Sequence, residues 1–364
     1  MKSLTLMSFA FLFLLSAVGF SQTTGAVYVN TNTTTNSIWV YTHGSDGMLA
    51  FAGAYPTQGA GSNAGDLSSQ GSVALSKNGR LLFAVNAGSN EVTSFRVNAG
   101  ALTFVQKVSS GGTFPVSVAI FGNLLYVLNA HGTSNITAFR VGTTGTMTPI
   151  ANSTRNLSTA LPKPAQVGFS PNGKVLVVAE ISTNKIDTFT VAANGLATGP
   201  RVQNSAGPGP FGFAFDTAGH LIVSEVTNSS TSSYSVAATG KLTPITRALI
   251  DFGKAACWVV NTNNPNFAQQ YSYVTNTGDS TISAYVIASN GSISLLDANG
   301  QTFVLPSQSF PLDMAITTDS NFLYVLEGLG YGGLASFRIN TDGSLTQMQD
   351  ILGLPDSAYG IIGN

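Results

Sequence analysis

One short pattern recurs seven times along this chain of 364 residues and limits the folds that it can adopt. In six copies an aliphatic residue is followed three positions later by an aromatic one, and in the seventh Thr231 precedes Tyr234. Successive aromatic residues lie about 44 to 54 positions apart, close to the length that four short strands and their turns occupy in one blade of a β-propeller. The pairs are Ile38/Tyr41, Val92/Phe95, Ile136/Phe139, Ile186/Phe189, Thr231/Tyr234, Ile282/Tyr285 and Leu334/Phe337.

A glycine follows each of these aromatic residues, six positions later in six copies and five positions later after Phe95. Glycine readily adopts the positive φ that such a hairpin turn needs, so we expect the third and fourth strands of a blade to meet there. Residues three apart in a strand point to opposite faces, and a strand that is apolar on both faces must be buried on both. The glycines are Gly47, Gly100, Gly145, Gly195, Gly240, Gly291 and Gly343.

The two ends of the chain each provide part of a blade. Residues 26–29 have the pattern of a second strand without a first, and residues 358–362 that of a first strand without a second. We expect the two segments to pair and to close the ring, which leaves no open sheet edge. The sequence therefore predicts an all-β fold, a seven-bladed β-propeller of four-stranded antiparallel blades, with residues 22–364 as a single domain.

The first 21 residues have the features of an export signal: Lys2, an apolar stretch, and small residues before a cut ahead of Gln22. We expect a secreted or periplasmic protein with no membrane anchor after cleavage. The formal net charge of -1 and the absence of a basic run argue against nucleic-acid binding. Cys257, the only cysteine, lies in an apolar run and is expected in the core, and no motif predicts a metal or another cofactor.

Three carboxylates occupy equivalent places at the ends of apolar second strands. They are Glu180, Glu225 and Glu327, and a ring of them around the channel mouth would suit a general acid or base, a cation site or recognition of a polyhydroxylated ligand. The alternative is structural, because a carboxylate that ends a strand often accepts backbone N–H bonds and fixes a loop. Both interpretations remain open at this point.

Other polar residues are expected on the same face of the ring. His131 follows another second strand, and Lys163, Arg247 and Lys254 fall in the predicted connections between blades. We predict Glu180, Glu225 and Arg247 as catalytic residues, with a glutamate as general base and Arg247 or Lys163 holding the substrate anion. Substrate-binding residues are predicted to be Lys163, Glu327, His131 and Lys254.

Several segments resemble the lactonase-like seven-bladed propeller family, which includes a bacterial phosphogluconolactonase and fungal carboxymuconate cyclases. The resemblance implies lactone opening or closure at the channel mouth by His, Arg and Glu, with Glu180 as the nearest match to the glutamate. This chain has neither His nor Arg where its innermost strands are expected to begin. The similar segments are residues 169–174 with 177–180, 211–215 with 219–225, 256–259, 311–315 and 337–339.

Two functional hypotheses follow. The first is a secreted lactone hydrolase or cyclase that acts on a sugar lactone or a carboxylated lactone at the channel mouth. The second is a non-catalytic propeller that binds a carbohydrate, an envelope component or a protein on the same face. In either case we expect a monomer that needs no cofactor.

Overall fold

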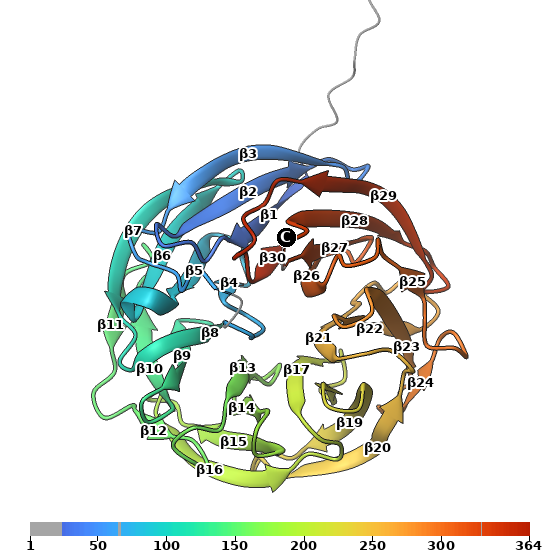
Figure 1. Ribbon diagram of the computed structural model, residues 1–364. Coiled ribbons are helices and arrows are strands. Elements are labelled where there is room, and N and C mark those ends of the chain that lie inside the picture. The colour runs from blue at the N-terminus through green and yellow to red at the C-terminus, as the bar shows by residue number, and fades with distance from the viewer. Residues whose placement is uncertain (1–23, 65–66, 329) are drawn as a thin grey trace, which may run out of the picture.

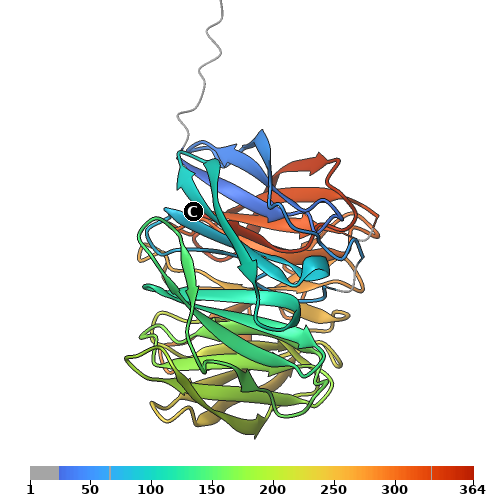
Figure 2. The same ribbon diagram turned by 90° about the vertical axis from the view of Figure 1, so that its left-hand side faces the viewer.

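The computed structural model describes residues 24–64, 67–328 and 330–364, and within them seven antiparallel sheets surround a common centre (Figure 1). Five sheets have four strands, and in the other two the fourth strand is divided into two short pieces. The predicted all-β propeller of seven four-stranded blades is confirmed. Neighbouring blades pack face to face around the ring, as the side view in Figure 2 shows.

Each blade is described from the channel outwards. The first contains β30 (Ile361–Gly363), β1 (Gly25–Asn30), β2 (Ser37–His43) and β3 (Leu49–Pro56). The second contains β4 (Val73–Leu75), β5 (Leu81–Asn86), β6 (Glu91–Asn98) and β7 (Ala101–Ser109), with the short 3-10 helix η1 (Ala87–Ser89) between β5 and β6. The third contains β8 (Thr113–Phe121), β9 (Leu124–His131), β10 (Asn135–Val141), β11 (Met147–Pro149) and β12 (Arg155–Asn156).

The remaining four blades follow in sequence order. The fourth contains β13 (Pro164–Phe169), β14 (Val175–Glu180), β15 (Lys185–Val191) and β16 (Ala197–Asn204). The fifth contains β17 (Pro210–Phe215), β18 (Leu221–Glu225), β19 (Ser230–Val236) and β20 (Leu242–Ile250). The sixth contains β21 (Ala256–Asn261), β22 (Gln270–Asn276), β23 (Thr281–Ile287), β24 (Ile293–Leu295) and β25 (Phe303–Val304), and the seventh β26 (Pro311–Ile316), β27 (Phe322–Glu327), β28 (Gly333–Ile339) and β29 (Leu345–Leu352).

The repeated sequence signals have the structural roles expected of them. In the third strand of the fourth blade, Ile186 and Phe189 point to opposite faces and both are fully buried. All seven repeat glycines have positive φ, between 74° and 92°. Some of these glycines also connect neighbouring blades, because their carbonyl oxygens accept hydrogen bonds from buried tyrosine hydroxyls in the second strand of the preceding blade. Tyr126 donates to Gly195 at 2.8 Å, and Tyr273 donates to Gly343 at 2.8 Å.

The ring is closed by the two ends of the described chain. β1 pairs with β2 on one side and with β30 on the other, and the second of these pairings places Val27 opposite Gly363 and Val29 opposite Ile361. The predicted closure by terminal strands is confirmed. The innermost strands then follow one another around the channel, with β4 in contact with both β30 and β8.

The export signal predicted for residues 1–21 lies outside the described residues. Within the part of the chain that the structure describes, no helix has the length and apolar character needed to cross a membrane.

Candidate functional site

Two side chains near the middle of the channel reach across it. The Gln70 amide, just before β4, donates to the carbonyl of Val259 in β21 at 2.7 Å and accepts the N–H of the same residue at 3.1 Å. The Trp258 indole donates to the carbonyl of Ser69 at 2.9 Å. Gly212 leaves room for this arrangement, because a Cβ there would lie 2.3 Å from Oε1 of Gln70.

A fully buried carboxyl group lies on the channel wall in the seventh blade. Asp313 of β26 accepts N–H bonds from Met314 at 2.9 Å, from Ile361 at 3.3 Å and from Gly71 at 3.5 Å, so that it connects three neighbouring blades. Burial raises the pKa of Asp313 to about 7, and the three N–H groups lower it only in part. The group was not singled out from the sequence, where it is one acidic residue in an apolar run.

A cavity of about 440 Å³ opens where three consecutive innermost strands begin. Residues just before β4 and at the starts of β8 and β13 form it, together with the end of β9. Its volume is in the range of small-molecule binding sites, and its walls are mainly apolar. It is lined by Leu67, Ser68, Phe114, Val116, Ala130, His131, Leu161, Lys163 and Pro164. This mouth cavity brings together two residues predicted to bind substrate, His131 and Lys163.

His131 is held in the mouth cavity by stacking. Its ring lies against that of Phe114, with the centroids 4.0 Å apart and the planes inclined by 15°. Phe114 precedes Pro115 and adopts a φ of 58°, and its N–H donates to Oδ1 of Asn90 at 2.7 Å. Because His131 is exposed and its stacking uses only the ring face, both imidazole nitrogens can reach a ligand.

Lys163 enters the mouth cavity from the corresponding place in the next blade. It precedes Pro164, adopts a φ of 53°, and its carbonyl accepts the N–H of Ile181 at 3.1 Å. Its side chain is exposed. Among the described residues the ion pairs are Lys107–Glu91 and His220–Asp216, so the Lys163 ammonium is available to an anion.

The three glutamates lie within their own blades and do not meet at the mouth. Glu225 is fully buried and accepts hydrogen bonds from the N–H of Gly207 at 2.7 Å and from the hydroxyls of Ser205 at 3.2 Å, Ser232 at 2.6 Å and Ser230. This is the structural role given as the alternative for these carboxylates, in which the glutamate accepts N–H bonds and fixes a loop. The catalytic role predicted for Glu225 stays a prediction, but its oxygens are already occupied by donors.

Glu180 belongs to a pair of buried carboxyl groups. It accepts hydrogen bonds from the hydroxyl of Thr183 at 2.6 Å and from the N–H of Ser158 at 3.1 Å, and a further bond from the Ser158 hydroxyl. Burial and the neighbouring Glu180 raise the pKa of Asp187 to about 8. The pair therefore holds a proton near neutral pH, inside the blade and away from the mouth cavity.

Glu327 differs from the other two. It is fully buried, and its side-chain partners are the Ser309 hydroxyl and the Asp350 carboxyl group. Burial and the Asp350 carboxylate raise its pKa to about 8, and the Ser309 hydroxyl lowers it only in part. Its role in substrate binding, like that of Lys254, stays a prediction.

The glutamate position is repeated in every blade, with asparagine in the other four. All seven residues are fully buried. The asparagines make similar contacts: the Asn86 amide, for example, donates to Thr93 at 2.9 Å and accepts from Thr57 at 2.6 Å. The sequence carried this signal, since each asparagine also follows the apolar run of a second strand. The seven are Asn30, Asn86, Asn129, Glu180, Glu225, Asn276 and Glu327.

The remaining two predicted residues do not line the mouth cavity. Arg247 was expected in a connection between blades, and this placement is wrong, because it lies within the outermost strand β20 with an exposed side chain. The outer strand is nine residues long, since register shifts against β19 accommodate extra residues that the sequence pattern does not show. Lys254 does lie in a connection, between β20 and β21, and is exposed.

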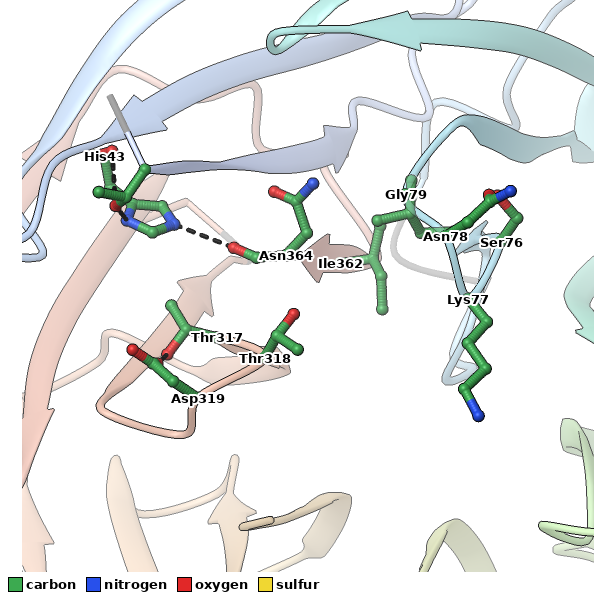
Figure 3. A pocket seen from close by; sticks show the side chains of 13 residues that line it. His43, Ser76, Lys77, Asn78, Gly79, Thr317, Thr318, Asp319, Ile362 and Asn364 are labelled. Carbon is green, nitrogen blue, oxygen red and sulfur yellow. Dashed lines mark hydrogen bonds between the residues drawn. The ribbon is translucent and has the colours of Figure 1, made fainter. Parts of the chain in front are cut away.

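A second and larger cavity, of about 670 Å³, opens on the opposite face (Figure 3). It lies beside β30, between the turn at residues 76–79 and the turn at residues 317–319. Lys77 extends into it, while His43 is directed toward Asn364, with Nε2 3.1 Å from the Asn364 carbonyl oxygen. Asp319 accepts hydrogen bonds from Thr317 at 2.6 Å and from the side chain of Asn321 at 2.6 Å.

Comparisons with solved structures show the same fold in bacterial proteins of similar length. A Lactobacillus plantarum protein is 18% identical, with a TM-score of 0.73 and coverage of 93% of this chain and 99% of its own. A Bacteroides fragilis protein, provisionally described as a 6-phosphogluconolactonase, is 19% identical with a TM-score of 0.70, covering 93% and 98%. The periplasmic gluconolactonase of Pseudomonas aeruginosa is 17% identical with a TM-score of 0.68, covering 92% and 98%.

No curated protein sequence matches the chain significantly. The family model for the seven-bladed β-propeller lactonases matches residues 20–156 and 153–260, which is more than half of the chain. The repeats, the confirmed ring of seven blades and this match agree: the chain belongs to the seven-bladed β-propeller lactonase family.

Proposed function

We propose that the mouth cavity binds and hydrolyses a small lactone that carries a carboxylate or a phosphate. The observation that supports this most directly is that His131 and Lys163 lie in one cavity of about 440 Å³. Membership of the lactonase family supports the reaction class, as does the fold shared with a periplasmic gluconolactonase. We propose His131 as the base in place of Glu180 or Glu225, whose carboxylates already accept several hydrogen bonds.

In this mechanism the imidazole of His131 accepts a proton from a water molecule as the water oxygen attacks the lactone carbonyl. The ammonium of Lys163 binds the anionic group of the substrate and fixes its position. When the ring C–O bond breaks, the imidazolium returns the proton to the leaving alkoxide, and the product is a hydroxy acid. Leu67, Val116 and Leu161 exclude water from the rest of the ligand.

Export is part of the proposal. The apolar segment before Gln22 supports delivery of the chain outside the cytoplasm, where a carboxylated lactone, rather than a phosphorylated one, would be the anionic substrate that it meets. Comparing fractions of cells that express the full chain, and sequencing the N-terminus of the product, tests both export and the cleavage position.

The test of the reaction uses the purified chain from residue 22 and a set of sugar, sugar-phosphate and carboxylated lactones, with acid release followed at constant pH. We expect hydrolysis above the spontaneous rate for at least one anionic lactone, lost in His131→Gln and weakened in Lys163→Met. Lys174→Met, an exposed lysine in the turn after β13, is the matched control and should behave as the unmodified chain. No hydrolysis of any lactone, or equal rates in His131→Gln, would contradict the proposal.

A second candidate function is supported by the stacked pair of Phe114 and His131. A flat aromatic surface beside an apolar wall suits the face of a sugar ring. In addition, no carboxylate among the described residues pairs with the His131 ring to orient it, as a general base would require. A non-catalytic carbohydrate-binding propeller would bind sugars or sugar acids in calorimetry without hydrolysing any lactone. Saturable binding that is lost in Phe114→Ala, together with absent turnover, would favour it.

A further inference from the structure

A further cavity, of about 500 Å³, lies on the face opposite to the mouth cavity, between the second and third blades. The turn at residues 76–79 and the turn between β8 and β9 form two of its sides. Lys77 lies between it and the larger cavity on this face, and extends into the larger one (Figure 3). We call it the basic cavity, and its lining residues include Asn78, Arg80, Leu81, Asn123 and Thr143.

The second, third and fourth blades carry an excess of positive charge. Residues 73–204, which form them, contain ten Lys and Arg residues but three Asp and Glu residues, whereas the rest of the described chain contains four Lys and Arg residues and twelve Asp and Glu residues. The three carboxyl groups do not reach the basic cavity: Glu91 pairs with Lys107 at 3.0 Å, and Glu180 and Asp187 are buried in the fourth blade. In the described part of the chain no carboxylate lines the cavity, so its position favours anions.

Two arginines supply positive charge at the basic cavity. Arg80 lines it, and Arg96 lies opposite Leu81 in the ladder of β5 and β6, so the side chains of Arg96 and Leu81 share one face of the sheet. That face is turned toward the third blade, since a Cβ on Gly145 would lie 3.0 Å from Cδ2 of Leu81. Both arginines are exposed, and neither side chain forms an ion pair or a hydrogen bond with another described residue. Their guanidinium groups are therefore available to bind an oxyanion.

The asparagines of the basic cavity also present donors. The side-chain oxygen of Asn78 already accepts hydrogen bonds from the Ser76 hydroxyl at 2.8 Å and from the N–H of Arg80 at 3.1 Å. The side-chain oxygen of Asn123 accepts one from the Arg140 guanidinium at 3.0 Å. Both asparagines are exposed, so their NH2 groups can donate to a ligand. Guanidinium and amide donors without a carboxylate suit a ligand that is rich in oxygen acceptors.

The walls of the basic cavity narrow the class of anion. About 500 Å³ is more than an inorganic anion needs and falls in the range of small-molecule sites. Within the described chain no aromatic ring lines the cavity, so it lacks the stacking platform on which single-stranded nucleic acids are held. A lipid surface is bound by apolar side chains that protrude, which a hollow does not provide. Leu81 and Val141 instead offer a small apolar surface to the C–H face of a sugar ring.

We propose that the basic cavity binds a carboxylated sugar, either free or as one unit of an acidic polysaccharide. Arg80 and Arg96 bind the carboxylate. The NH2 groups of Asn78 and Asn123 donate to hydroxyl and ring oxygens, and the Thr143 hydroxyl can accept from a sugar hydroxyl. The site lies on the face opposite to the mouth cavity, so it does not depend on the reaction proposed there.

The test measures binding of a short oligogalacturonate to the purified chain from residue 22 by calorimetry. We expect saturable binding that weakens several-fold when salt rises from about 50 to about 200 mM, because salt screens exposed charges. A neutral malto-oligosaccharide of the same length should not bind. Monomeric galacturonate distinguishes the two sources of the sugar: much tighter binding of the oligomer assigns a polysaccharide, and equal affinity assigns a free sugar acid.

Two variants locate the site. Arg80→Gln and Arg96→Gln change exposed side chains, and each should weaken binding at least about 10-fold, because a charge-assisted hydrogen bond is lost. Thermal unfolding checks that both variants are folded. Lys241→Gln is the matched control, since Lys241 is an exposed cation on the same face, in the turn between β19 and β20, and its replacement should leave the affinity unchanged.

Four outcomes would overturn the proposal. The first is no binding of either galacturonate ligand, and the second is equal binding of the neutral oligosaccharide. The third is an unchanged affinity when both arginines are replaced together. The fourth is tighter binding of single-stranded DNA, or of vesicles of phosphatidylglycerol and phosphatidylcholine, under the same conditions.

Discussion

The two ends of the channel carry similar side chains in very different states. On the opposite face, in the larger cavity, His43 is buried, with Nδ1 3.2 Å from the Gly44 carbonyl oxygen and Nε2 3.1 Å from that of Asn364. In the smaller mouth cavity, His131 is exposed and only stacked on Phe114. Residue type and cavity volume therefore indicate less about function than whether the polar atoms of the side chain already have hydrogen-bond partners within the protein.

The largest effect is expected when each of the two histidines is replaced in turn. His131→Gln should lower kcat for the best lactone by about 10² to 10⁴-fold, because a general base contributes about that much. His43→Gln should leave kcat of the folded protein unchanged and lower Tm instead. Initial rates and thermal unfolding of the two variants check this, and an equal loss of kcat in both would remove the distinction between the two ends.

Buried carboxyl groups between the two ends predict a pH dependence of stability. The pKa of Asp313 rises from 3.8 to about 7 on folding, so between these values the folded state holds a proton that the unfolded state has released. The stability contributed by protonated Asp313 is therefore complete below about pH 4, declines as the pH rises, and is lost once the pH has passed through 7. A shift of this size corresponds to on the order of 4 kcal/mol, at about 1.4 kcal/mol for each pKa unit.

The measurement is the unfolding free energy between pH 5 and pH 8.5, for the unmodified chain and for Asp313→Asn. Asp187, with its pKa raised to about 8, adds a decrease in the same direction. We expect the slope to become shallower in Asp313→Asn. A slope that is identical in the variant would show that Asp313 does not hold its proton in the folded state.

The glutamates that end second strands should affect stability rather than rate. Glu225→Ala leaves the N–H of Gly207 and three serine hydroxyls without their acceptor, and should cost about 3 kcal/mol of unfolding free energy. Glu225→Gln keeps one acceptor oxygen and should cost less. Denaturant unfolding measures both variants, and a loss of kcat in the folded Glu225→Gln protein would return Glu225 to the catalytic role predicted from the sequence.

The smallest expected effect concerns the two lysines. Lys163→Met should raise KM for anionic lactones by about 10-fold and change it little for neutral ones, because one exposed charge contact is lost. Lys77→Met, in the larger cavity on the opposite face, should leave KM unchanged for both kinds of substrate. Steady-state kinetics at two salt concentrations check this, since screening should weaken the Lys163 contribution as well.

The sequence predicted the fold well because its signals are local and repeated. Each blade carries its own aromatic residue and turn glycine, and seven copies make the period visible. Closure by the terminal strands was also predictable, since each end offered a fragment that only the other could complete.

The site was harder to predict, because it depends on contacts between distant parts of the chain. Glu180, Glu225 and Glu327 were singled out as rare charges, yet their equivalence to Asn86 and Asn276 indicates a repeated structural role. The stacking of His131 on Phe114 depends on a positive φ at a non-glycine residue, which no local pattern shows. Arg247 was misplaced because extra residues in β20 shift where the strand ends.

The pairing of β1 with β30 has a consequence for the order of assembly. The inner edge of β1 can find its partner only after residues 361–363 have been synthesised, so the blade that is begun first is finished last. Until then the backbone N–H and C=O groups on that edge of β1 are unpaired and can form hydrogen bonds with other strands. We expect ribosome-bound chains that lack the last few residues to remain protease-sensitive in β1–β3, while blades made wholly from the middle of the chain are already protected.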